Sequence, residues 1–142
     1  MQNGWDEVLI LEDDFKLQHS AAWTFGRWAR FRVMVPNYQV ASWAHNCLDT
    51  RSGPGDMHLL GGSDAGVARV RYLQTTSAYA VRLSAMPQLK SIYEEAIAQN
   101  RPFDRHMTRI AGDLERFAFV PALSIQRASY SDIRFEPVDY GC

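Results

Sequence analysis

Three adjacent carboxylates, Glu12, Asp13 and Asp14, are the strongest chemical signal in the chain. They follow the apolar run at residues 8–11, whose composition is typical of a strand buried on both faces of a parallel sheet. In an extended chain Glu12 and Asp14 point to the same face about 7 Å apart. Two such charges repel by roughly 3 kcal/mol at an effective dielectric constant of about 20. Mg²⁺ or Mn²⁺, completed by phosphate oxygens and water, would relieve that repulsion, and a solvated acidic turn is the alternative.

The helices and strands that must position these groups are predicted from the spacing of apolar residues and from Gly and Pro residues, which mark where elements end. Strands are expected at residues 8–11, 39–44, 67–73, 75–81 and 117–120, and helices at 20–35, 84–97 and 104–111. The first helix has Ser20 as its expected cap and Pro36 as its stop, and its apolar side is expected to contain Ala21, Phe25, Trp28, Ala29 and Arg32. Residues 49–66 are expected to form a long surface loop, and residues 124–142 an irregular tail.

Composition limits the class of protein. The chain has 142 residues, 46% of them hydrophobic, and a net charge of −1, which indicates one folded domain spanning residues 1–142. A charge near zero argues against a nucleic-acid partner. The start is acidic rather than basic, and the run at 8–11 is too short to span a membrane. Cys47 and Cys142 lack the spacing of a zinc or redox site, so two free thiols and a cytoplasmic location are expected.

Four motifs in order resemble glycosyltransferase family 25, which includes lipooligosaccharide glycosyltransferases and collagen galactosyltransferases. Residues 8–15, Val-Leu-Ile-Leu-Glu-Asp-Asp-Phe, resemble its LEDD signature. Residues 75–81 are similar to a segment with Thr, then Ala or Gly, Tyr and a hydrophobic residue, and residues 102–104 are similar to its Pro-hydrophobic-Asp. Its closing motif is matched by Pro121, Gln126, Ser131, Asp132 and Ile133. The resemblance covers residues 8–133.

The resemblance implies a partial GT-A-like, Rossmann-related α/β fold with a mixed sheet flanked by helices. It also implies metal-dependent transfer, with inversion, from a nucleotide-sugar donor to a hydroxyl of a glycan, lipopolysaccharide or protein. Glu12 and Asp14 would hold Mn²⁺ or Mg²⁺, which neutralises charge on the leaving diphosphate. Asp104 would be the base that deprotonates the acceptor, with a helix cap as its alternative role.

Six further residues are candidates for contact with donor or acceptor. Many enzymes of this fold have a metal-binding His late in the chain, and this sequence has Gln126 and Asp132 in that region. Thr75 and Thr76 are suited to bonding sugar hydroxyls, although they are also strand formers, and Tyr79 is either a sugar contact or a core residue. The candidates are Asp13, Thr75, Thr76, Tyr79, Gln126 and Asp132.

One departure from the family pattern concerns the beginning of the chain. The acidic motif begins at residue 12, with no nucleotide-binding half before it, so the chain corresponds to the C-terminal two-thirds of a GT-A domain. We expect the strand at 8–11 to have an exposed edge. Three explanations compete: the chain is a fragment of a longer protein, it covers the edge by self-association, or it has lost catalysis and only binds. We expect a homo-oligomer through this edge, with little or no transferase activity of the chain alone. Two other classes compete: a non-catalytic carbohydrate-binding or assembly module, and a phosphatase of the haloacid dehalogenase type, which needs a nucleophilic Asp where Glu12 stands.

Overall fold

The structure is a computed structural model that describes residues 6–50, 57–59, 66–110, 114–127, 129–131 and 136–138. Its helices are α1 (Ala21–Met34), the short 3-10 helix η1 (Leu83–Ala85), α2 (Met86–Ala98) and α3 (Phe103–Ile110). Its strands are β1 (Glu7–Leu11), β2 (Phe15–Leu17), β3 (Val40–Ser42), β4 (Cys47–Thr50), β5 (Met57–Leu59), β6 (Gly66–Gln74), β7 (Ala78–Arg82), β8 (Arg116–Val120), β9 (Ser124–Gln126), β10 (Ser129–Ser131) and β11 (Glu136–Val138).

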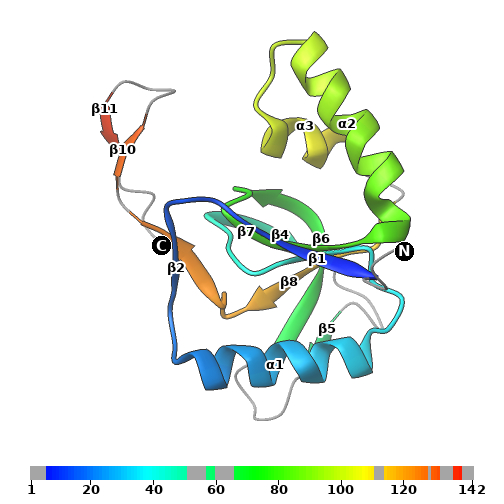
Figure 1. Ribbon diagram of the computed structural model, residues 1–142, viewed down its shortest axis with the longest axis vertical. Coiled ribbons are helices and arrows are strands. Elements are labelled where there is room, and N and C mark those ends of the chain that lie inside the picture. The colour runs from blue at the N-terminus through cyan, green and yellow to red at the C-terminus, as the bar shows by residue number, and fades with distance from the viewer. Residues whose placement is uncertain are drawn as a thin grey trace, which may run out of the picture.

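A mixed seven-stranded sheet forms the centre of the fold. Its order is β1-β7-β3-β8-β6-β4, with β5 also paired to β6. The β3–β8 pair is parallel and the other pairs are antiparallel. Helix α1 covers one face, and α2 and α3 lie on the other (Figure 1). The predicted α/β class, a mixed sheet flanked by helices, is confirmed.

β1 differs from the strand that its composition predicted. It pairs antiparallel with β7 instead of lying inside a parallel sheet, and it is the end strand of the sheet. Val8 and Ile10 pack on the α2 side and Leu9 packs on the α1 side, so both faces are apolar as predicted. The strand is nevertheless only half-buried, because the described residues provide a neighbouring strand on one side alone, and Leu11 is 44% exposed.

Helix α1 begins and ends where the sequence indicates, but its buried face is different. The Ser20 side chain accepts a hydrogen bond from the Trp23 backbone N–H at 3.3 Å, and the helix ends before Pro36. Phe31 and Thr24 are fully buried, with the partly buried Trp23 and Trp28 beside them. The predicted apolar side was wrong in four of its five members, since Ala21, Phe25, Ala29 and Arg32 are exposed.

The aromatic core beneath α1 explains which face of the helix is buried. The Trp28 ring lies 5.5 Å from the rings of Phe31 and Trp43 and 5.6 Å from that of Tyr38. Aromatic pairs at these separations add to the free energy of burial. The helix therefore turns its bulkiest rings toward the sheet and leaves Phe25 at the margin.

Helices α2 and α3 form the layer above the other face. The sequence predicts a helix that begins at Ser84. In the structure Ser84 lies in η1, and α2 begins at Met86 with Pro87 in its first turn. Helical spacing predicts an apolar stripe of Met86, Leu89, Ile92, Tyr93, Ala96 and Ile97 on this helix. Leu89, Ile92 and Ala96 are buried, whereas Tyr93 and Ile97 are exposed. Helix α3 confirms the predicted short helix. Within the described ranges, each helix lacks the length and apolarity needed to cross a membrane.

Three other expectations were wrong. The described part of the predicted loop at 49–66 consists of the end of β4, all of β5 and the first residue of β6. The predicted irregular tail contains β9, which pairs with β2, and the β10–β11 hairpin. The extended segment predicted from residue 75 begins only at β7, because Thr75 has a φ of 87° and the chain turns there. The strands β5, β9, β10 and β11 have three residues each. Three residues are too few for alternation of apolar and polar side chains to predict a strand.

Candidate functional site

A cavity of about 570 Å³ opens at the edge of the sheet where β1 and β3 end, beneath the start of α3. β1 and β3 are both antiparallel to β7, so their carboxyl ends share this edge. Six predicted site residues meet here although they are far apart in the chain. They are Glu12, Thr75, Thr76, Tyr79, Asp104 and Gln126. The volume of this cavity is within the usual range for small-molecule binding sites.

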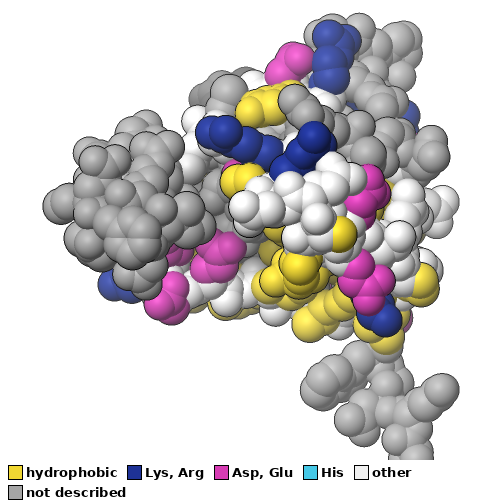
Figure 2. All heavy atoms as spheres, turned by 90° about the horizontal axis from the view of Figure 1, so that it is seen from above, with side chains coloured by type: hydrophobic (Ala, Val, Ile, Leu, Met, Phe, Trp, Pro, Cys, Tyr) yellow, Lys and Arg dark blue, Asp and Glu magenta, His cyan; other side chains and the backbone are white. Residues whose placement is uncertain are grey.

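The acidic triplet lies in a tight turn and not in an extended strand. The Phe15 backbone N–H donates to the Glu12 carbonyl at 3.2 Å. Arg127 closes the turn from outside, since its guanidinium donates to the Asp13 carbonyl at 2.7 Å and its backbone N–H to the Asp14 carbonyl at 2.8 Å. The Asp13 side chain is exposed and does not line the cavity. Viewed from the α2–α3 side, acidic side chains gather where this turn lies (Figure 2).

Asp14 lies behind the cavity and is joined to it by Gln126. The Gln126 side-chain amide donates to Oδ2 of Asp14 at 2.8 Å. The other oxygen, Oδ1, is buried and has no hydrogen-bond partner among the described residues. A buried carboxylate oxygen without a partner is costly unless a cation or a donor reaches it.

Glu12 points into the cavity and is bonded by one neighbour. Its Oε1 accepts a hydrogen bond from the Thr76 hydroxyl at 2.9 Å. Partial burial raises the pKa of Glu12 above its ordinary 4.5, the Thr76 hydrogen bond opposes that rise, and the charges of nearby acids, Asp14 first, add to it. The Glu12 carboxylate is thus in an environment that favours a compensating positive charge.

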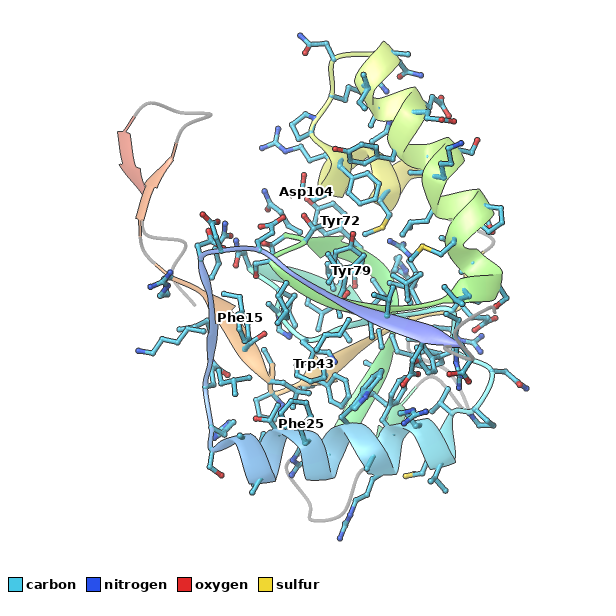
Figure 3. All side chains as sticks on the ribbon, viewed as in Figure 1. Phe15, Phe25, Trp43, Tyr72, Tyr79 and Asp104 are labelled. Atoms are coloured by element: carbon cyan, nitrogen blue, oxygen red, sulfur yellow. The ribbon has the colours of Figure 1, made fainter. Side chains whose placement is uncertain are left out.

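Asp104 faces the acidic motif from the first turn of α3 (Figure 3). Its Oδ1 accepts from the Arg105 backbone N–H at 2.7 Å, so it does bond a free donor at the helix start. Its Oδ2 accepts from the Thr75 backbone N–H at 3.3 Å. The carboxylate therefore lines the cavity with one oxygen directed to the helix and the other to the β6–β7 connection.

Aromatic side chains supply the apolar part of the cavity wall. Tyr79 is only 9% exposed and packs in the core on the α2 side, which makes it chiefly a core residue. Burial, and secondarily the charge of Glu12, raises the pKa of Tyr79 to about 12. The Tyr93 and Phe103 rings form an edge-on pair 5.1 Å apart at the rim.

The oxygen ligands around the acidic turn suit a divalent ion whose shell is completed by other groups. Among the described residues no three His, Cys, Asp or Glu side chains come together as a complete metal cage. Two carboxylates, on Glu12 and Asp14, are what Mg²⁺ or Mn²⁺ requires when phosphate oxygens and water complete its shell. The unpartnered Oδ1 of Asp14 and the raised pKa of Glu12 fit such an ion.

The cavity also contains residues that the sequence analysis missed. Asn46 donates to Oε1 of Gln126 at 3.2 Å, and Arg105 brings a positive charge to the wall. Asn46 follows the carboxyl end of β3 as Glu12 follows that of β1, and this shared position is the signal that could have identified it. Helical spacing predicted Tyr93 as a core residue rather than a site residue, and no pattern indicated Arg105. The remaining candidate, Asp132, lies outside the described residues.

Comparisons with known proteins add no relative. The chain matches no protein-family model, and no curated protein matches it significantly. The site therefore has to be interpreted from its own geometry and chemistry.

Proposed function

We propose that this chain is a metal-dependent, inverting glycosyltransferase that moves a sugar from a nucleotide-sugar donor to a hydroxyl acceptor, of glycan, lipopolysaccharide or protein type. The observation that supports the proposal is the meeting of Glu12, Asp104 and Gln126 at one cavity, with Asp14 held behind Gln126. The acidic motif and Asp104, which come from separate elements, thus lie at the same cavity. The acidic motif is suited to binding a cation, and Asp104 is suited to accepting a proton.

The two sides of the cavity have separate roles in this proposal. Glu12 and Asp14 hold Mn²⁺ or Mg²⁺, which when bound neutralises charge on the leaving diphosphate. Asp104 accepts the proton of the acceptor hydroxyl as that oxygen bonds to the anomeric carbon and the bond to the diphosphate breaks.

A carbohydrate-binding module without catalysis is the second candidate, and the aromatic rim favours it. Tyr93 is 52% exposed and stands against Phe103, which offers an apolar surface to a sugar ring. Such a surface serves binding whether or not transfer follows.

Release of UDP from a panel of UDP-sugars, with Mn²⁺ or with EDTA, separates the two candidates. A transferase releases UDP only with metal, and Asp104→Asn abolishes most of the release. Asp49→Asn is the matched control, because Asp49 is an exposed carboxylate on β4 that does not line the cavity. Sugar binding without metal-dependent release identifies a binding module, and neither binding nor release refutes both candidates.

We also propose a reducing, cytoplasmic location for the protein.

We further propose that the chain self-associates through the outer edge of β1. That edge consists of a largely apolar strand whose two faces are both packed, and the charged residue of the strand, Glu7, lies at its start and is paired with Arg32. Leu11→Lys adds a charge at the exposed end of the strand. Sedimentation of the parent as a dimer and of Leu11→Lys as a monomer supports this interface, and a monomeric parent refutes it.

A further inference from the structure

Thr75 has an unusual backbone for its residue type. Its φ is 87°, in the left-handed region that a β-branched side chain rarely adopts. Such conformations persist only where surrounding contacts hold them, and they are concentrated at functional sites. Thr75 is 7% exposed and lies in the wall of the cavity.

Both polar groups of Thr75 that point to the cavity are used by site residues. Its backbone N–H donates to Oδ2 of Asp104 at 3.3 Å. Its hydroxyl donates to Oε1 of Gln126 at 3.1 Å. The left-handed turn is what places these two donors toward α3 and β9 at the same time.

Three contacts hold the Gln126 side-chain amide in one orientation. Its Nε2 donates to Oδ2 of Asp14, 2.8 Å away, because a carboxylate oxygen only accepts. Its Oε1 accepts from the Asn46 side-chain amide at 3.2 Å and from the Thr75 hydroxyl at 3.1 Å. Asp14 is then held by one oxygen, and its second oxygen stays unpartnered.

We propose that Thr75 is a positioning residue that fixes the orientation of the Asp104 carboxylate and, through Gln126, that of the Asp14 carboxylate. Its strained backbone persists for this reason. The inference rests on the proposed function, since it treats Asp14 as a metal ligand and Asp104 as the base. It changes the expected role of Thr75 from contact with a sugar hydroxyl to orientation of the groups around it.

Three substitutions separate positioning from a structural role. Thr75→Val removes the hydroxyl but keeps the shape, Thr75→Ser keeps the hydroxyl, and Thr75→Gly removes the strain together with the hydroxyl. The matched control is Thr24→Val, which removes a fully buried hydroxyl from α1 on the opposite face of the sheet.

The first measurement is NMR of the Gln126 side-chain amide without metal. We expect slowly exchanging amide protons in the parent, in Thr75→Ser and in Thr24→Val, and loss of that protection in Thr75→Val and Thr75→Gly. The second is calorimetry with Mn²⁺ and UDP, in which Val and Gly at position 75 should weaken Mn²⁺ binding by about tenfold to a hundredfold, the usual effect of losing a partner of a metal ligand. Thr75→Gly should also unfold at a temperature no lower than Thr75→Val.

The outcomes distinguish this inference from the proposed function. Unchanged amide protection in Thr75→Val and Thr75→Gly overturns the positioning role, whatever the metal does. Loss of protection in Thr75→Val and Thr75→Gly, together with a parent protein that is protected but binds no Mn²⁺, supports the positioning role and refutes the metal-dependent function. A fall in stability of both variants in proportion to their loss of Mn²⁺ binding also overturns the inference, because it indicates a role in folding alone.

Discussion

The amide of Gln126 donates a hydrogen bond to the Oδ2 of Asp14 at 2.8 Å, across a sequence separation of 112 residues. This contact joins the turn after β1 to the end of β9, and the neighbouring β2–β9 pair holds the two segments in register. The acidic motif is therefore anchored from the far end of the chain. Orientation of a ligating carboxylate by such a partner is a common property of metal sites.

Asp104→Asn tests the base. Because the proton is taken only as the acceptor attacks, the substitution should lower the turnover number of transfer by about two to four orders of magnitude while UDP affinity is kept. Steady-state transfer and UDP titration measure the two quantities. Retained transfer with a lower unfolding temperature would instead identify Asp104 as a residue that only bonds the start of α3.

Glu12→Gln should alter stability in a way that depends on pH. Partial burial raises the pKa of Glu12 from 4.5, so the folded chain binds this proton more strongly than the unfolded chain. The stabilising contribution of protonated Glu12 is complete below pH 4.5 and is lost as pH rises through the raised pKa. The unfolding temperature of Glu12→Gln relative to the parent should consequently increase across that window.

Thermal unfolding of both proteins over a pH series measures this difference. Adding Mn²⁺ at neutral pH should reduce it, because a bound cation favours the ionised parent carboxylate. A difference that does not vary with pH, or that falls as pH rises, contradicts the assigned environment of Glu12.

Trp28→Ala tests the core that supports the sheet. Its ring contacts Phe31, Tyr38 and Trp43, and truncation should cost about 3 kcal/mol of unfolding free energy, at the lower end for large aromatic residues because Trp28 is partly exposed. Val33→Ala on the same helix should change it by less than about 0.5 kcal/mol, since Val33 is 81% exposed. Urea denaturation compares the two, and equal losses would show that α1 is packed differently.

Local patterns in the sequence predicted the elements that have strong local signals. The Ser20 cap and Pro36 located α1, and the apolar run at residues 117–120 located most of β8. The neighbours of β1 could not be predicted, because an apolar run indicates burial but not the direction of the adjoining strand. β2 and β9 were missed because three-residue strands depend on a partner distant in sequence.

The site was predicted in its residue types but not in its connections. The order of motifs selected Glu12, Asp104 and Gln126, which the fold brings to one cavity. The bond from Gln126 to Asp14 and the turn at Thr75 are tertiary contacts, which leave no periodic trace in the sequence. Asn46 could have been selected from its position after the end of β3, but its bond to Gln126, 80 residues away, could not be predicted.

We propose that Glu12 and Asp14 would together hold a divalent ion whose coordination shell is completed by a nucleoside diphosphate. Calorimetric titration of Mn²⁺ into the parent and into Asp14→Asn, each with and without UDP, measures this binding. We expect measurable Mn²⁺ binding by the parent, tighter binding when UDP is present, and a weakening of both effects in Asp14→Asn. Equal Mn²⁺ binding by the two proteins, or parent binding that UDP does not strengthen, would contradict it.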